Sequence, residues 1–362
     1  MMSKICTSRN YREWLEKTIS TYPYVVFYGC GNSYPSILHA WNKAMSRKVD
    51  MVCDRNSEKW DTPQAEVPCI SPASLEKIKN ECIVFLTLGH VDEAAAFLTE
   101  KGFPAVFPLY KYDLQYWAEN PALDLGELNR SLSNARECFS DQRSREIFDA
   151  VATRIFCGND APDGMARICE PAPYFARGVV NLTAHESFVD AGAFDGDTLE
   201  EFLNYSGGCF DNYYAFELCG SNCSRLKKVV SRMREKERIE VFEAGLGNIR
   251  ETVRYDSAAM ETNVGTGDEV GEIFALDDVL KDRKVTFVKM DIEGFEWKAL
   301  HGAENTIRTR KPILAVCVYH RASHLWEIPL YLKSLLPEYR IYMRHHSQLG
   351  YETVCYAVPE GR

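Results

Sequence analysis

One pattern occurs twice along this chain and constrains its fold more than any other feature. Each copy has a short apolar run, a turn that contains glycine, a helical pattern, and a second apolar run that ends in an acid. The first copy starts at 24–31 and ends at Asp54, and the second starts at 187–192 and ends at Glu217. This order predicts two βαβ units. We therefore expect an α/β fold with two parallel sheets.

The first copy predicts a Rossmann-like N-terminal domain. After strands at 24–31 and 49–54, with a helix at 34–46 between them, the run at 83–88 indicates a third strand. The run at 105–109 indicates an edge strand, because Pro108 cannot donate to a ladder. We expect this domain to cover residues 1–117, a helical and loop connector to cover 118–180, and a second domain to cover 181–362.

The second half predicts a different kind of sheet. Runs at 239–244, 285–291 and 313–318 read as further strands, the last two as buried parallel strands, while 256–271 is polar without an apolar period. The closing runs at 339–344 and 351–358 are separated only by a short segment, which fits a hairpin and not a crossover. A parallel sheet that ends in an antiparallel hairpin is typical of the seven-stranded, Rossmann-like methyltransferases.

Composition excludes several classes of protein. Lys plus Arg number 42 and Asp plus Glu 52, so the net charge of −10 argues against nucleic acid or an anionic membrane as the main partner. The most apolar runs are too short to span a bilayer, and the first residues do not predict a signal peptide. The 13 scattered cysteines fit free thiols. We expect a cytoplasmic protein that acts on a small molecule.

The segment 190–198 is the first candidate binding element. It follows a strand and opens a helix, and Gly192 and Gly196 would give a cofactor close access to the backbone. Glu217 lies 27 positions after Asp190 and ends the next strand, where a carboxylate can accept both hydroxyls of a ribose. Small residues at 243–248 leave space for a flat base. Each feature has a plainer interpretation as a tight turn or a strand-end acid.

Four motifs together carry a resemblance to a known family. They are Phe188-Val-Asp-Ala-Gly-Ala-Phe-Asp-Gly-Asp-Thr198, Ala215-Phe-Glu217, Leu276-Asp-Asp278, and Lys289-Met-Asp-Ile-Glu-Gly-Phe-Glu-Trp-Lys-Ala-Leu-His-Gly-Ala303. This part of the chain, about 186–362, resembles the FkbM family of S-adenosylmethionine-dependent methyltransferases. The resemblance implies a class I methyltransferase fold, S-adenosylmethionine as methyl donor, and a hydroxyl of a sugar or sugar-bearing metabolite, such as a nucleotide-sugar, as acceptor.

The resemblance also implies roles for single residues. Those implied or expected to bind the cofactor are Asp190, Gly192, Ala193, Phe194, Gly196, Thr198, Glu217, Ala244 and Gly245. The sequence departs from the commoner family pattern at Phe194, where Asn is frequent, and at Leu218-Cys219, where Pro-Asp often follows the acid. These departures affect contact details more than the identity of the cofactor.

Asp291, Glu293 and His320 are the candidate catalytic residues. Methyl transfer to a hydroxyl needs in-line alignment and a group that takes the proton. Asp291 and Glu293 end one predicted strand and would share one face, while His320 follows the next strand. Capping of the following helix is the plainer interpretation of the two acids. His320 and His324 at i, i+4 lack a clear third metal ligand, so we predict no metal, although Asp291 and Glu293 could take Mg²⁺ with a substrate diol.

Three alternatives stay open at this point. Arg344, His345 and His346 form a basic group suited to an anionic acceptor or, equally, a solvated turn.

Gly29 and Asp54 outline a nucleotide site, so the N-terminal domain could serve an NAD(P)-dependent oxidoreductase, bind a nucleotide-sugar acceptor or dock a partner. No Tyr has Lys four positions later, which weakens the oxidoreductase interpretation. The third alternative is a non-catalytic binding protein that keeps the fold. The sequence does not predict the oligomeric state, and a homo-oligomer is one possibility.

Overall fold

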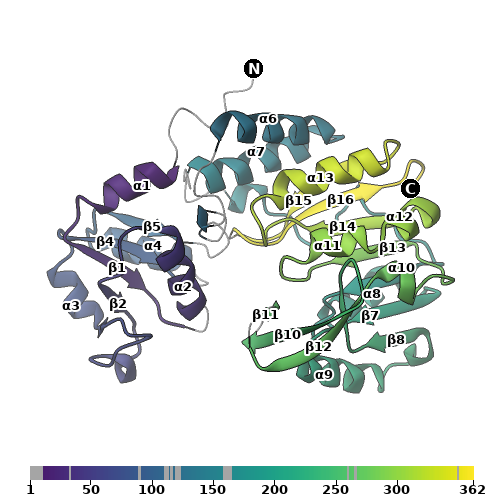
Figure 1. Cartoon of the computed structure of the whole chain (residues 1–362), viewed down its shortest axis with the longest axis horizontal. Helices are drawn as coiled ribbons and strands as arrows, with labels where there is room; N and C mark the ends of the chain where they lie inside the picture. The colour runs from purple at the N-terminus through teal and green to yellow at the C-terminus, as the bar shows by residue number, and fades with distance from the viewer. Residues whose placement is uncertain are drawn as a thin grey trace. The chain divides into compact units, whose positions relative to one another are not determined.

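The chain divides into two compact units in its computed structural model. The structure describes residues 11–31, 34–88, 91–109, 114, 117–118, 124–157, 165–258, 261–264, 267–348 and 350–362. Contacts assign 1–131, 150–165 and 321–323 to the first unit, and 132–149, 166–320 and 324–362 to the second. Both units are shown in Figure 1. None of the described helices is long and apolar enough to cross a membrane.

The first unit is built on a five-stranded parallel sheet in the order β3-β2-β1-β4-β5. Its strands are β1 (Tyr24–Tyr28), β2 (Met51–Cys53), β3 (Cys69–Ile70), β4 (Cys82–Leu86) and β5 (Val106–Pro108). Its helices are α1 (Tyr11–Ile19), α2 (Tyr34–Ala44), the 3-10 turn η1 (Ser57–Lys59), α3 (Pro72–Lys77) and α4 (Val91–Glu100). The predicted edge strand with Pro108 is confirmed, since β5 pairs only with β4 among the described strands. Gly89 and His90, which follow the third predicted strand, lie outside the described residues.

The second unit contains a seven-stranded sheet in the order β15-β16-β14-β13-β6-β7-β8. Its strands are β6 (Ser187–Ala191), β7 (Asn212–Phe216), β8 (Ile239–Phe242), β13 (Phe287–Met290), β14 (Ile313–Cys317), β15 (Arg340–His345) and β16 (Thr353–Val358). The first five pair in parallel, and β16 runs antiparallel to both β14 and β15. The predicted parallel strands and closing hairpin are confirmed, and with them the class I methyltransferase fold.

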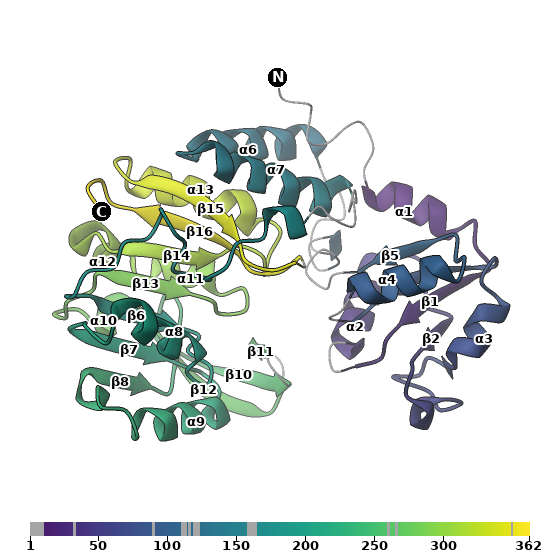
Figure 2. The same cartoon turned by 180° about the vertical axis from the view of Figure 1, so that it is seen from behind.

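Helices cover both faces of this sheet, with α11 and α12 nearer the viewer in Figure 1 and α8 in Figure 2. The helices from residue 125 onward are α6 (Leu125–Cys138), α7 (Gln142–Cys157), η2 (Ala166–Ile168), α8 (Asp197–Ser206), α9 (Gly220–Val230), η3 (Lys236–Arg238), α10 (Leu276–Val279), α11 (Glu296–His301), α12 (Glu304–Arg310) and α13 (His324–Leu335). Contacts assign 125–131 of α6 and 150–157 of α7 to the first unit. Fully buried strands β6, β13 and β14 form the centre of the core, where Phe188 and Phe287 have ring centroids 4.7 Å apart. Burial on both faces explains their continuous apolar sequences.

A second, smaller sheet is formed by strands between 245 and 274, a range that includes the polar segment 256–271, for which the sequence predicts no strand. Its strands are β9 (Gly245–Leu246), β10 (Glu251–Ala258), β11 (Glu261–Val264) and β12 (Glu269–Phe274), in the order β11-β10-β12-β9. Val270 on β12 is 60% exposed while Tyr255 on β10 is buried, so the apolar alternation is weak. Strands with so few buried positions lack the period on which sequence interpretation depends.

Candidate functional site

The candidate site lies at the point in the seven-stranded sheet where the strand order reverses. From β6 the chain continues to β7 on one side, while β13 pairs on the other side of β6. In open α/β sheets, ligands bind beyond the carboxyl ends of the strands at this switch point. The turns after the two strands touch: a Cβ on Gly192, whose φ is +80°, would lie 1.8 Å from the carbonyl oxygen of Asp291. Only glycine fits this close approach.

A buried ion pair fixes the carboxyl ends of β6 and β13. Lys289 Nζ lies 3.0 Å from Asp190 Oδ1, and both side chains are almost fully buried. Lys289 also donates to the Gly192 carbonyl at 2.7 Å, and the hydroxyl of Tyr213 donates to Asp190 Oδ2 at 2.5 Å. Asp190 is predicted to bind the cofactor, and in the structure its side chain contacts Lys289 and Tyr213. Through them Asp190 orients the turn at Gly192.

Glu217 is held with its carboxylate near the same turn. The backbone N–H of Phe194 donates to its Oε2 at 2.9 Å, and that of Cys219 donates to its Oε1 at 2.8 Å. Burial raises the pKa of Glu217, and these two hydrogen bonds oppose that rise. Because each oxygen also has a second lone pair, the carboxylate can accept from a diol while its orientation is already set.

The two departures from the family pattern fall on these two donors. Phe194 and Cys219 hold Glu217 through backbone N–H groups, which every residue except proline has, so a change of side chain leaves both hydrogen bonds intact. Phe194 has a φ of +46°, a left-handed conformation in which Asn is more frequent than Phe. The guanidinium of Arg225 lies 5.7 Å from its ring centroid.

The remaining predicted cofactor residues surround this turn. The N–H groups of Gly192 and Ala193 both donate to the Phe216 carbonyl at 3.0 Å, which joins the turn to β7. Gly196, with φ +105°, caps α8, and Thr198 is buried in the first turn of that helix. Ala244 is buried just beyond β8, and Gly245 starts β9. All lie near the carboxyl ends of neighbouring parallel strands.

Asp291 and Glu293 follow β13 as predicted and remain partly exposed, with 24% and 25% of their side chains accessible. Tyr174 donates to Asp291 Oδ2 at 2.7 Å, and Tyr319 donates to Oδ1 at 3.0 Å. Burial would raise the pKa of Asp291, but the charges of His320 and Lys289 and the Tyr174 hydrogen bond lower it overall. Asp291 is therefore ionised at neutral pH. Glu293 has a φ of +52°, and such strain is often stored at functional sites.

His320 lies just beyond β14 and is surrounded by carboxylates. Its Nε2 is 3.4 Å from Asp291 Oδ1 and 3.6 Å from Glu293 Oε2, while its Nδ1 is 2.7 Å from Glu296 Oε1. Burial would lower the pKa of His320, but the facing carboxylates Glu296, Glu293 and Asp291 raise it to about 10. Without a further cation the imidazole is protonated at neutral pH, so it serves the carboxylates as a charge partner.

Glu296 joins the two histidines of the i, i+4 pair. Its Oε1 contacts His320 and accepts from the Ile292 N–H at 2.9 Å, and its Oε2 lies 3.4 Å from Nδ1 of His324. Burial would raise the pKa of Glu296, yet the neighbouring His320 dominates and lowers it strongly. Asp291, Glu296 and His320 each offer a ligand atom, and these atoms lie within 4.8 Å of one another. Sequence reasoning had assigned Glu296 no role.

Tyr174 is the second site residue that sequence reasoning missed. It comes from the predicted connector and has a φ of +66°. Its N–H donates to the hydroxyl of Tyr356 at 3.1 Å, and its own hydroxyl reaches Asp291. Burial raises the pKa of Tyr174 well above its usual value, so the hydroxyl remains a donor. No local motif marks a tyrosine that lies more than a hundred positions before its partner.

The basic group at 344–346 is buried, so the interpretation as a solvated turn is wrong. Arg344 lies 2.7 Å from Asp141 Oδ2 and 3.3 Å from Glu170 Oε2. His345 is fully buried beside Thr353, and Nε2 of His346 is 2.8 Å from the hydroxyl of Tyr356. These partners lie within the second unit, which gives the three residues structural contacts in place of the surface expected for an anionic acceptor.

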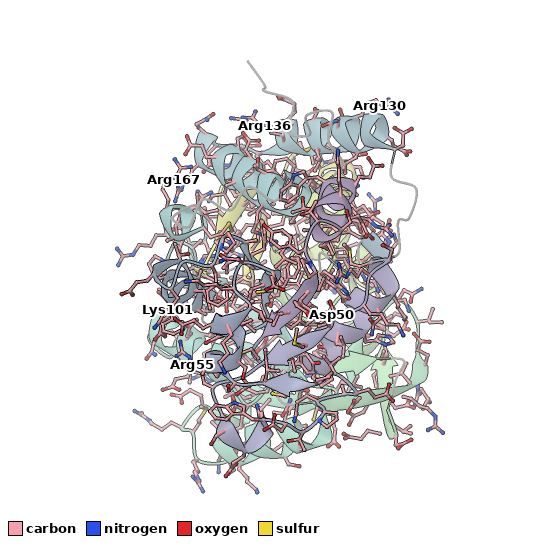
Figure 3. All side chains as sticks on the ribbon, turned by 90° about the vertical axis from the view of Figure 1, so that its left-hand side faces the viewer. Asp50, Arg55, Lys101, Arg130, Arg136 and Arg167 are labelled. Carbon is pink, nitrogen blue, oxygen red and sulfur yellow. The ribbon has the colours of Figure 1, made fainter. Side chains whose placement is uncertain are left out.

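In the first unit, the residues that outline a nucleotide site contact other residues of the protein. A Cβ on Gly29 would lie 2.8 Å from a side-chain carbon of Leu88, so this glycine makes room for packing. Asp54 accepts from the Cys30 N–H at 2.9 Å and lies 3.2 Å from Lys59 Nζ. Arg55 and Lys101 lie on one side of this unit, 5.3 and 5.9 Å from the ring of Phe97 (Figure 3).

Residues 190–352 match the family model of the methyltransferase FkbM domain. This part of the chain is a methyltransferase FkbM domain. The match begins at Asp190 and includes Glu217, Asp291, Glu293 and His320. It leaves out Tyr174, which contacts the family's domain from outside the matched range.

A solved structure of similar fold supports the fold of this chain. The chain is similar to a methyltransferase FkbM from Methylobacillus flagellatus, with a TM-score of 0.73, 20% identity, and coverage of 95% of this chain and 92% of that one. An rRNA methylase from Streptococcus thermophilus has a TM-score of 0.33 at 16% identity over 49% of this chain and 90% of its own. Fibrillarin from Aeropyrum pernix, solved with S-adenosyl-L-methionine, has a TM-score of 0.33 at 14% identity over 50% and 71%. No curated protein sequence matches the chain.

Proposed function

We propose that this FkbM-family methyltransferase uses S-adenosylmethionine to methylate a hydroxyl of a carbohydrate or nucleotide-sugar. One observation carries the proposal. Glu217, beyond β7, and the Asp291–Glu293 pair, beyond β13, lie on the two sides of the switch point after β6. On one side of the bound methyl donor, this reaction needs a carboxylate that accepts hydrogen bonds from the ribose. On the other side it needs a pair of acids beside the transferred methyl group.

The residues present fit an adenosyl cofactor. Glu217 has its carboxylate oriented by two backbone N–H groups and can accept from both ribose hydroxyls. Gly192 and Gly196 add no side chain to the turn after β6, and Ala244 and Gly245 add no more than a methyl group beyond β8. S-adenosylmethionine would supply a methyl group on a sulfonium, which transfers by in-line displacement.

The acids beyond β13 would handle charge and the proton. Asp291 is held ionised by two tyrosine hydroxyls and by His320, which suits attraction of a positively charged donor and makes it a weak base. Glu293 lies within the same group and is partly exposed. We assign Glu293 the role of accepting the proton of the acceptor hydroxyl, while His320 orients both acids.

The acceptor class and the location of the protein rest on different support. A hydroxyl acceptor of the carbohydrate class follows from the FkbM resemblance, and the net charge of −10 favours a small molecule over nucleic acid. The described cysteines are free thiols, which fits a reducing compartment such as the cytoplasm. The domain bounds 1–117, 118–180 and 181–362 also remain proposals.

A transfer assay with labelled S-adenosylmethionine tests this function. The purified protein would be offered a panel of nucleotide-sugars and free glycosides, and the products analysed by mass spectrometry and NMR. We expect a single O-methylated product, and we expect Glu293→Gln to lower its rate by about 10²- to 10⁴-fold, the usual contribution of a general base. His301→Gln, an exposed substitution on α11, is the matched control. A product methylated on nitrogen or carbon would contradict the proposal.

A further inference from the structure

A set of metal-binding donor atoms converges beside the proposed methyl-transfer site. Nε2 of His320 lies 3.4 Å from Asp291 Oδ1 and 3.6 Å from Glu293 Oε2. Both distances exceed the 2.7–3.2 Å of an ordinary N–H···O hydrogen bond. They do match the spacing of about 3.0–3.6 Å between neighbouring ligands on a metal whose bonds are about 2.0–2.2 Å long. The spacing therefore allows His320 to share an ion with either carboxylate.

The other nitrogen of His320 has the partner that metal-bound histidines usually have. Nδ1 is 2.7 Å from Glu296 Oε1, and both side chains are fully buried. Glu296 is itself fixed by the Ile292 N–H at 2.9 Å. A carboxylate on the far nitrogen sets the ring orientation and makes the near nitrogen a better ligand. This contact aims Nε2 at Asp291 and Glu293.

The charge of the group also favours a cation. Asp291, Glu293 and Glu296 bring three carboxylates to one histidine ring, and the nearby charge of Lys289 is paired with Asp190. A metal ligand must be the neutral imidazole, so a divalent ion at Nε2 would take the place of the ring proton. The ion and a bound sulfonium together would balance the three negative charges.

We propose that His320, Asp291 and Glu293 bind one divalent first-row transition metal ion such as Mn²⁺, with Glu296 as the positioning residue behind His320. An imidazole nitrogen among the ligands favours Mn²⁺, Fe²⁺ or Co²⁺ over Mg²⁺. Three protein ligands leave positions for an acceptor oxygen, and Asp291 and Glu293 are partly exposed on that side. The ion would hold the acceptor oxygen and lower the pKa of its hydroxyl, and the carboxylate oxygen of Glu293 that does not bind the ion would accept the proton. The role of the ion depends on the proposed function, while its binding does not.

Mn²⁺ titration monitored by electron paramagnetic resonance tests the site on the full-length, metal-free protein. Free Mn²⁺ gives a sharp signal that is lost on binding, so the stoichiometry is measured without any substrate. We expect one ion per chain, at least tenfold weaker binding in Glu293→Gln and in His320→Gln, and unchanged binding in His301→Gln. A 10- to 100-fold loss in Glu296→Gln, with one ion still bound, would fit its positioning role.

Two results would overturn the proposal. One is the absence of binding up to millimolar Mn²⁺, and the other is binding to His320→Gln as tight as to the unchanged protein. Glu293 is partly exposed, so Glu293→Gln is expected to fold and keeps the test valid if His320→Gln does not. Binding of S-adenosylmethionine is measured on the same metal-free samples. Cofactor binding without metal binding rejects the metal site alone, and metal binding without cofactor binding rejects the proposed function alone.

Discussion

At the scale of single residues, Tyr174 provides a sharp test of how Asp291 is positioned. Its hydroxyl donates to Asp291 Oδ2 from outside the matched family domain. Tyr174→Phe removes that hydrogen bond to a charged acceptor while keeping the ring. We expect kcat to fall by about tenfold or more, since such bonds contribute about 1.5–3 kcal/mol, with little change in cofactor affinity. Tyr205→Phe, on an exposed ring stacked against Phe175, should leave kcat unchanged. Equal kinetics of the two variants would reject the role of Tyr174.

Gly192 tests the contact between the turns after β6 and β13. Gly192→Ala introduces a Cβ at 1.8 Å from the Asp291 carbonyl, and the backbone must shift to accommodate it. We expect a loss of about 2–4 kcal/mol in the free energy of unfolding, measured by urea denaturation. Gly207 is the control because its φ is also positive, at +60°, but a Cβ there meets no atom within 4 Å. Gly207→Ala should cost only about 1 kcal/mol.

At the scale of elements, the buried pair Asp190–Lys289 holds β6 beside β13. Lys289→Met leaves Asp190 buried without its charge partner, and breaking such a pair usually costs about 3–5 kcal/mol. The exposed pair of Lys227 and Glu243 provides the comparison, and Lys227→Met there should cost less than about 1 kcal/mol. Thermal unfolding of both variants measures the difference. Similar costs would mean that Asp190–Lys289 does not stabilise the sheet.

Strands and motifs with a local signal were predictable, and contacts across the sheet were not. Burial on both faces gives β6, β13 and β14 continuous apolar runs, and the switch from parallel strands to a hairpin is readable from segment lengths. The strands β10 and β12 were missed because few of their described positions are buried. The placement of Asp291, Glu293 and His320 near one another follows from their positions at strand ends. Glu296 and Tyr174 could not be assigned, because their roles depend on the rings and carboxylates that the fold brings to them.

At the scale of the whole molecule, an ion-pair group ties the segment before β6 to the closing hairpin of the second unit. Arg344 on β15 contacts Asp141 and Glu170, and Arg143 contacts Glu170 at 2.8 Å. Burial would raise the pKa of Asp141, but its hydrogen bonds to Arg344 and Ser144 lower it below its usual value of 3.8. A lowered pKa means that the unfolded chain binds more protons below about pH 4.

The stability of the protein should therefore fall as the pH drops through that range. We expect the free energy of unfolding to decrease below about pH 4 and Arg344→Met to make this decrease shallower, as measured by urea denaturation at a series of pH values. Arg340→Met, on the same strand but at an exposed position, is the control. An unchanged slope in Arg344→Met would show that Asp141 does not depend on Arg344.

The central claim is that the carboxyl ends of β6 and β7 bind S-adenosylmethionine through Glu217. Calorimetric titration of the purified protein with S-adenosylmethionine and S-adenosylhomocysteine, and with NAD(P), tests it most directly. We predict that both adenosyl ligands bind one site per chain and that Glu217→Gln weakens them by at least tenfold. Glu243→Gln, an exposed acid beyond β8, should leave their affinity unchanged. Binding of NAD(P) alone, or adenosyl binding that is indifferent to Glu217→Gln, would contradict the account.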